Sequence, residues 1–141
     1  MKKAFVLIIA IVVLLSITSS SLADISRDDA EKISGFDKFF GNWYSHEVKN
    51  TGLEYDCAIS IGFSDDVVCV INTQAETTHY NWLYTYKFYP TYDKDEETLY
   101  LSSEGEMVMK IKLEDGNLIV KYVSSLDAFF EGNTCIMTKL G

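Results

Sequence analysis

Proline and histidine are scarce in this chain, and cysteine occurs only three times. The 141 residues include one proline, Pro90, and two histidines, His46 and His79, which are far apart and lack partners at metal-ligand spacing. The sequence therefore predicts no metal site. It also contains no phosphate-binding loop, nucleophile elbow or Cys–His pair, so nothing in it predicts an enzyme or a cofactor.

Basic residues are also few, with 12 Lys and Arg against 21 Asp and Glu. A surface of this sign repels the phosphates of nucleic acids and anionic membranes. The acidic residues are scattered over turns rather than gathered in one run, which is typical of a solubilising surface. We therefore expect no nucleic-acid partner.

Long apolar runs are absent except at the N-terminus. Lys2 and Lys3 precede an unbroken apolar run over residues 4–15, and the small residues Ser21 and Ala23 follow it. This pattern is typical of a secretory signal peptide, residues 1–23, and the run is short for a membrane-spanning helix. We expect export, to an extracellular or periplasmic location without membrane attachment, of a single domain of residues 24–141. That domain has 10 basic and 21 acidic side chains.

The mature region consists mainly of strand patterns. Ser26 and the acidic residues after it predict a short helix that ends near Gly35. Turn-forming residues then separate eight segments with apolar alternation: 42–49, 53–62, 66–72, 78–89, 97–102, 106–113, 117–123 and 134–140. Eight such strands can form a sandwich or a closed barrel, and the short connections favour a meander. We predict an all-β fold, an eight-stranded antiparallel up-and-down barrel with a short N-terminal helix.

Side-chain alternation fixes the expected register of two hairpins. A two-residue turn at Asp115 and Gly116 places six apolar or aromatic residues on one face, as the pairs Leu113–Leu118, Ile111–Val120 and Met109–Tyr122. For the preceding hairpin, a three-residue loop over 103–105 would set Leu101 opposite Met107 and keep the faces consistent.

The stretch "SGFDKFFGNWYSHEV", residues 34–48, resembles the first signature of the lipocalins, a family in the calycin superfamily. Gly41, Trp43 and Tyr44 match the Gly-x-Trp-Tyr positions at the start of the first strand. The resemblance implies that the short helix closes the bottom of a barrel and that Trp43 packs beneath its cavity. The last strand departs from the family pattern, because it has Lys139 where the family usually has an arginine near this Trp.

An aromatic ladder on strand 78–89 is the main candidate for function. Together with apolar residues of the later strands it predicts a pocket wall of Tyr80, Trp82, Tyr84, Tyr86, Leu99, Leu101, Met107, Met109 and Tyr122. An eight-stranded barrel is wide enough for side chains alone or for one small ligand. The sequence thus leaves two functions open: a secreted binder of a small hydrophobic or aromatic ligand, or a filled barrel whose rim binds a protein, for example as a protease inhibitor.

Three cysteines, Cys57, Cys69 and Cys135, lie in the region expected to be exported, where disulfides form. If the turn between the second and third strands is centred on Phe63, Cys57 and Cys69 stand opposite each other, and we predict a bridge between them. The alternatives are a bridge that involves Cys135, and cysteines that serve as small buried apolar residues.

Overall fold

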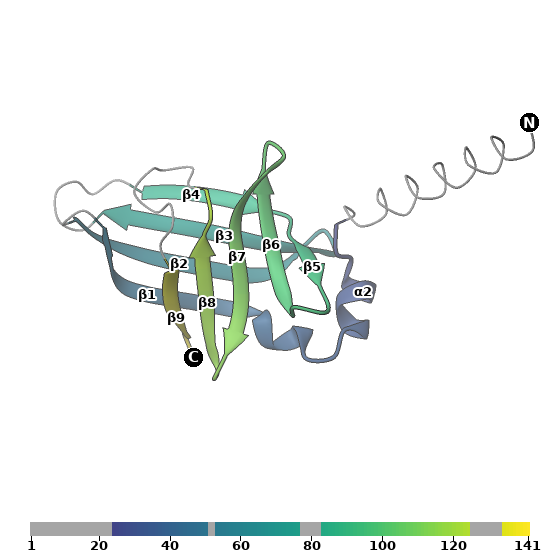
Figure 1. Ribbon diagram of the computed structural model, residues 1–141. Helices are drawn as coiled ribbons and strands as arrows, with labels where there is room; N and C mark the ends of the chain where they lie inside the picture. Colours follow the sequence, from purple (N-terminus) through teal and green to yellow (C-terminus); the bar gives the residue numbers. More distant parts are fainter. Residues whose placement is uncertain (1–23, 51–52, 77–82, 125–133) are drawn as a thin grey trace, which may run out of the picture.

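The computed structural model describes residues 24–50, 53–76, 83–124 and 134–141 (Figure 1). The expected signal peptide lies outside these residues. The described chain starts with a short helix, α2 (Arg27–Lys32), and a 3₁₀ turn, η1 (Phe36–Phe39). Nine strands follow: β1 (Gly41–Asn50), β2 (Leu53–Ser64), β3 (Val67–Glu76), β4 (Leu83–Phe88), β5 (Thr91–Asp93), β6 (Thr98–Ser103), β7 (Glu106–Glu114), β8 (Asn117–Tyr122) and β9 (Thr134–Lys139).

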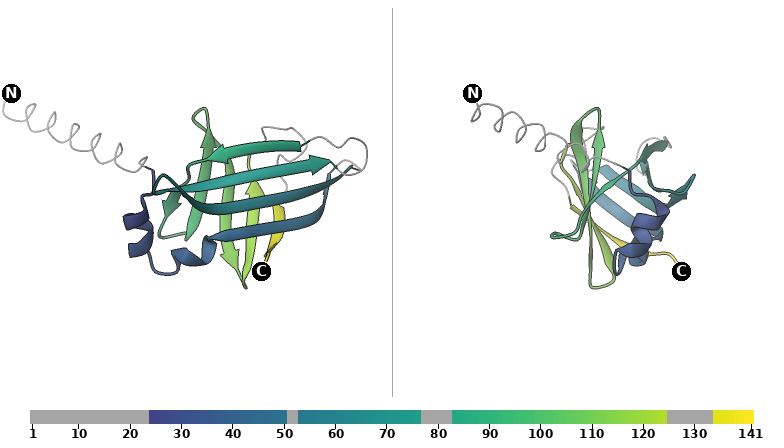
Figure 2. Two further views of the ribbon diagram at one scale, coloured as in Figure 1. Left: turned by 180° about the vertical axis from the view of Figure 1, so that it is seen from behind. Right: turned by 90° about the vertical axis from the view of Figure 1, so that its right-hand side faces the viewer.

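All nine strands belong to one antiparallel sheet with the order β4-β3-β2-β1-β9-β8-β7-β6-β5. The sheet curls on itself, so that β1–β4 and β5–β9 form two walls whose strands cross steeply around the interior (Figures 1 and 2). The all-β antiparallel prediction is confirmed. The prediction of eight strands is wrong, and the described strands form a curled half-barrel whose edges, β4 and β5, are not paired with each other.

The additional strand, β5, lies in a segment that we had expected to be a connection. Pro90 stands between β4 and β5 and has no N–H to donate to a sheet ladder. The chain therefore leaves the β3–β4 ladder after Phe88 and resumes at Thr91 as the partner of β6. This single break carries the chain from one edge of the sheet to the other.

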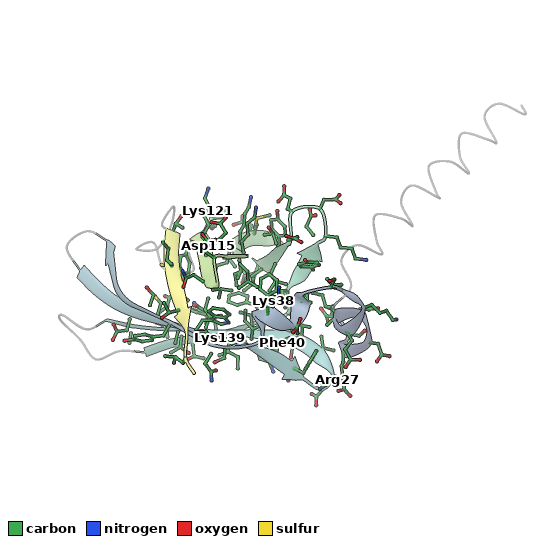
Figure 3. All side chains as sticks on the ribbon, turned by 90° about the horizontal axis from the view of Figure 1, so that it is seen from below. Arg27, Lys38, Phe40, Asp115, Lys121 and Lys139 are labelled. Atoms are coloured by element: carbon green, nitrogen blue, oxygen red, sulfur yellow. The ribbon has the colours of Figure 1, made fainter. Side chains whose placement is uncertain are left out.

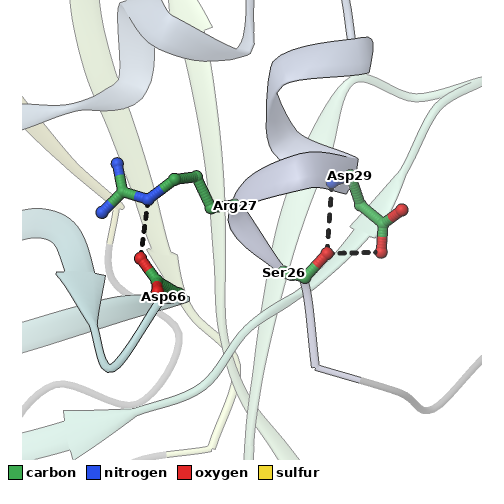
Figure 4. Close-up of polar contacts among 4 residues, drawn as sticks. All are labelled: Ser26, Arg27, Asp29 and Asp66. Carbon is green, nitrogen blue, oxygen red and sulfur yellow. Dashed lines mark hydrogen bonds and ion pairs between the residues drawn. The ribbon is translucent and has the colours of Figure 1, made fainter.

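The N-terminal helix begins as predicted. The Ser26 hydroxyl accepts a hydrogen bond from the Asp29 backbone N–H at 3.2 Å and lies 2.9 Å from the Asp29 carboxylate (Figure 4). Asp28 and Asp29 occupy the first turn, where negative charge is favourable. The helix ends at Lys32, earlier than predicted, because Ile33 already has an extended backbone. Gly35, which is left-handed with φ of 79°, then starts η1.

The segment before α2 is joined to the β2–β3 turn. The Arg27 N–H donates to the Asp66 carbonyl at 2.7 Å, and the Val68 N–H donates to the Ile25 carbonyl at 2.8 Å. The Arg27 guanidinium also pairs with the Asp66 carboxylate at 2.8 Å (Figure 4). Because this ion pair is exposed, we attribute the anchoring mainly to the backbone bonds.

The register of β7 and β8 is confirmed at all three predicted pairs, whereas that of β6 and β7 is wrong. Glu104 and Gly105 form a two-residue turn with φ of 52° and 82°, so Ser102 lies opposite Met107. The register then shifts by one residue, and Leu101 pairs with Met109 rather than Met107. This bulge restores the apolar face and leaves Met107 38% exposed.

The turn between β2 and β3 also differs from the prediction. Asp65 and Asp66 form it, with φ of 51° and 61°, and Ser64 pairs with Val67. Cys57 therefore lies opposite Gln74, and Cys69 lies opposite Gly62. Since Cys57 and Cys69 stand on opposite faces of the sheet, the prediction of a bridge between them is wrong, and all three cysteines are free thiols in this structure.

One end of the interior is closed by aromatic side chains, and we call it the capped end: Phe36, Phe39, Phe40, Trp43, Phe63 and Tyr92. Trp43 is 2% exposed, and its Nε1 donates to the Phe39 carbonyl at 2.9 Å. The Phe36 ring meets that of Tyr92 edge-on at 5.2 Å. Segments far apart in the chain thus converge on η1, seen from below in Figure 3, where Phe40 and Lys38 are labelled.

Gly41 and Lys139 lie next to Trp43 at the capped end. Gly41 has φ of 128°, a conformation that favours glycine, and a Cβ there would lie 2.6 Å from Lys139 Cε. Lys139 pairs with Trp43 in the sheet and holds its Nζ 5.4 Å from the Trp43 ring (Figure 3). Tyr44 points to the other face, where it is hydrogen-bonded to Asp56.

Candidate functional site

Away from the capped end, the interior contains a group of polar side chains that we call the polar cluster: Cys57, Asn72, Gln74, Tyr122 and Cys135. All five are buried, with exposed fractions between 0% for Asn72 and 5% for Gln74. Polar side chains are rarely this buried without a structural or functional reason. The polar cluster is therefore the candidate functional site.

Alternation along β3 brings the two amides into the interior. Val68, Val70, Asn72 and Gln74 are buried on one face of this strand. Asn72 lies between Ile59 on β2 and Tyr86 on β4, and Gln74 lies between Cys57 and Tyr84. The same face thus changes from apolar to polar along the strand. Tyr122 and Cys135 reach the cluster from β8 and β9 on the other wall.

The hydrogen bonds within the polar cluster leave part of its polar capacity unused. The Tyr122 hydroxyl donates to Asn72 Oδ1 over a long distance of 3.4 Å, and it is also hydrogen-bonded to Gln74 and Cys57. Asn72 Nδ2 and Gln74 Oε1 are buried and have no hydrogen-bond partner. Leaving such an atom without a partner costs about 1–3 kcal/mol. One unused donor and one unused acceptor therefore remain in the interior.

The ionisable groups of the cluster are one phenol and two thiols, and burial and their mutual contacts shift their pKa values. Burial raises the pKa of the Tyr122 phenol well above its usual value, and the nearby Cys57 and Cys135 thiols add to this effect. The hydrogen bond with Cys135, followed by burial, raises the pKa of Cys57. The site offers amide, phenol and thiol groups for hydrogen bonds, and its five side chains include no carboxylate, ammonium, guanidinium or imidazole group that would select an ionic ligand.

Aromatic rings of β4 lie beside the two amides on the same face. The Tyr84 and Tyr86 rings are stacked, with centroids 6.2 Å apart and an interplanar angle of 12°, and Tyr86 continues to Phe88 at 6.4 Å. Tyr84 is 41% exposed, whereas Phe88 is 6% exposed. The ladder therefore runs from the buried core outward to solvent past the polar cluster.

The structure divides the predicted pocket residues into four groups. Tyr84, Tyr86 and Tyr122 lie in or beside the polar cluster, whereas Tyr80 and Trp82 lie outside the described residues. Leu99, Leu101 and Met109 are buried in the hydrophobic core, and Met107 is exposed beyond the bulge. Sequence reasoning missed Asn72 and Gln74, although their alternation with Val68 and Val70 was a usable signal once the turn was placed at Asp65 and Asp66.

Other parts of the described surface are weaker candidates for a functional site than the polar cluster. Two grooves of about 330 and 350 Å³ lie beside η1, and one of about 390 Å³ lies on the outer face of β2–β4 near Cys69 and Lys87. Among the described residues there is no group of three or more His, Cys, Asp or Glu that could hold a metal ion. In the same part of the chain, no helix has the length and apolar character needed to cross a membrane.

The chain has no match among protein-family models, curated proteins or solved structures. Its assignment as an all-β curled half-barrel therefore rests on its own strand order and register.

Proposed function

We propose that this protein is an exported, lipocalin-like carrier that binds one small, planar, partly polar ligand in its interior at the polar cluster. The observation that carries the proposal is the pair of buried atoms without partners, Asn72 Nδ2 and Gln74 Oε1. A ligand with one hydrogen-bond acceptor and one donor, such as an amide or a heteroaromatic ring, would satisfy both.

The surroundings of the two atoms favour an aromatic ligand. The Tyr84 and Tyr86 rings extend from the amides toward solvent and offer flat apolar surface along a path of entry. Because the cluster contains no acidic or basic side chain other than its phenol and thiols, recognition would depend on shape, stacking and hydrogen bonds. The lipocalin-like motif at Gly41 and Trp43 supports the same proposal, since ligands in that family occupy the barrel interior.

A second function is favoured by a different observation. The interior face of the β6–β9 wall holds a run of fully buried apolar side chains: Leu99, Leu101, Ile111, Leu118, Val120 and Met137. On the outer face of that wall, Lys110 and Lys121 pair directly opposite each other, and Ile136 is 61% exposed. Like charges in cross-strand pairs are unfavourable. A filled barrel whose outer surface binds an acidic protein would explain this arrangement.

Native mass spectrometry of protein purified from the medium of a secretory host tests the carrier proposal. We expect the folded protein to carry an added mass that denaturation releases. Gln74→Met and Asn72→Leu should lose this mass. Thr73→Val, a change on the outer face of the same strand where Thr73 lies 3.4 Å from Thr85, should retain it.

The outcomes separate the two functions. Protein without added mass that also fails to bind any of a panel of planar aromatic amides would overturn the carrier proposal and favour the protein-binding one. Equal retention of the mass by all three variants would show that the ligand lies elsewhere.

A further inference from the structure

Two of the three cysteines meet in the interior. Cys57 on β2 and Cys135 on β9 are 0% and 4% exposed and belong to one buried core. Cys57 pairs with Gln74 and Cys135 pairs with Val120, on the two walls that the hydrogen bond from Tyr122 to Asn72 joins. A hydrogen bond between the two thiols is the leading cause of the shift in the pKa of each. Cys69 is on the outer face of β3, opposite Gly62, and is separated from this pair by the sheet. The three thiols are therefore not equivalent: two are in direct contact, and one stands alone.

The thiol pair lies where the two walls of the sheet are joined least. Between β1 and β9 the ladder consists of two residue pairs, Trp43–Lys139 and Tyr44–Thr138. By comparison, β2 and β3 are paired from Ser64–Val67 to Tyr55–Glu76. A covalent link from β2 to β9 would span the short β1–β9 ladder. Because this ladder is short, the strands can adjust as the two sulfurs approach from hydrogen-bond contact to about 2.05 Å.

We propose that Cys57 and Cys135 form a disulfide when the protein is exported, and that Cys69 remains a free thiol. This inference rests on the export that is part of the proposed function. The oxidant is the active-site disulfide of a thiol–disulfide oxidoreductase in the export compartment. Its disulfide takes up two electrons and two protons and becomes a dithiol, while the two cysteines lose their S–H protons and gain the S–S bond.

The bridge has a direct consequence for the polar cluster. Tyr122 is hydrogen-bonded to Cys57 and lies beside Cys135, so oxidation removes a thiol proton from the hydrogen bonds around the phenol. It also fixes the distance between the wall that carries Gln74 and the wall that carries Tyr122. The oxidised protein therefore presents a more rigid cluster than the reduced one.

Counting thiols tests the proposal without reference to any ligand. Protein from the medium of a secretory host is denatured without reductant, in the presence of a maleimide, and analysed by intact mass and peptide mapping. We expect one maleimide, on Cys69, and a peptide that joins Cys57 to Cys135, with an intact mass equal to that of the reduced chain plus one maleimide less about 2 Da. Labelling of three thiols, or a bridge that includes Cys69, would overturn the proposal.

A second experiment tests whether the two cysteines can form the bond in folded protein that is oxidised without export. Reduced, folded protein is exposed to oxidised glutathione, a small-molecule disulfide, and Cys69→Ser serves as the matched variant. We expect the Cys57–Cys135 link in both proteins, with no maleimide label on the variant. Failure of both to form this link would contradict the inferred geometry. Neither arm depends on ligand occupancy, so a negative result here leaves the carrier proposal to its own test.

Discussion

The capped end and the polar cluster lie in the same interior, but their buried polar atoms differ in how well they are hydrogen-bonded. At the capped end, the Trp43 Nε1 has a full-strength bond of 2.9 Å to the Phe39 carbonyl. In the polar cluster, the Tyr122 hydroxyl donates to Asn72 at 3.4 Å, and two amide atoms lack partners. The capped end is therefore arranged for stability, whereas the unpaired atoms of the polar cluster lower the stability of the fold.

The loss of stability caused by the unpaired amide atoms is informative because apolar residues could occupy the same positions. Val68 and Val70 show that β3 accepts valine on its inner face. Replacing both partners of a buried polar pair by apolar groups is often neutral or stabilising. Local conflicts of this kind are expected at functional sites. Four changes test the contrast, from the largest expected effect to the smallest.

Trp43→Ala should have the largest effect. It removes a large buried side chain and its hydrogen bond to Phe39, so we expect the free energy of unfolding to fall by about 3–5 kcal/mol. Urea denaturation followed by circular dichroism measures it. Trp43→Phe keeps most of the apolar volume and should lose less. A loss below about 1 kcal/mol in the alanine variant would contradict the structural role of the capped end.

Gly41→Ala tests the backbone that leads into Trp43. Because φ is 128° there, an alanine is strained even if the Lys139 side chain moves aside, and we expect a loss of about 1–3 kcal/mol. Gly62→Ala is the matched control, since nothing lies within 4 Å of its Cβ position. Equal behaviour of the two variants in urea denaturation would rule out a special requirement for Gly41.

Tyr122→Phe tests the burial of the polar cluster through the dependence of stability on pH. The unfolded chain releases its tyrosine protons near pH 10, whereas burial keeps the proton on Tyr122 in the folded protein. The Tyr122 contribution is thus fully present below pH 10 and is lost as pH rises further, by about 1.4 kcal/mol per pH unit. Urea denaturation at pH 9 and 11 should show a smaller difference in the variant than in the wild type.

Gln74→Met should have the smallest effect on stability and the opposite sign. It removes an unpaired buried carbonyl at the cost of one hydrogen bond to Tyr122, so we expect a gain of up to about 1 kcal/mol. Urea denaturation at pH 7 measures it on ligand-free protein. If the variant loses more than 2 kcal/mol, the polar cluster is a structural element and the contrast with the capped end fails.

The start of the helix was predictable, and the residues that lead into β1 were noticed, because both are local in the sequence. Ser26 and the acidic residues after it are a common helix start, and Gly41, Trp43 and Tyr44 lie within one short motif. The β7–β8 hairpin was predictable for the same reason, since a two-residue Asp-Gly turn sets its register.

The polar cluster was not predictable, because its residues come together only when distant registers are correct. Placing the β2–β3 turn at Phe63 rather than at Asp65 and Asp66 put Cys57 opposite Cys69. The bulge between β6 and β7 shifted Met107 in a similar way. Both errors concern residues with positive φ in tight turns, which aspartate and glutamate adopt less often than glycine. Contact between Cys57 and Cys135 depends on how the two walls cross, which no local pattern encodes.

The backbone bonds between residues 25–27 and the β2–β3 turn bear on the order of events during biogenesis. A signal peptidase binds its substrate in an extended form, as proteases generally do, and the expected cleavage site after Ala23 is two residues before Ile25. Once the Ile25 carbonyl and the Arg27 N–H are bonded to β3 and its turn, this stretch no longer fits an extended protease groove. If residues 1–23 are a leader, as the proposed export requires, their removal would precede completion of the fold at this stretch.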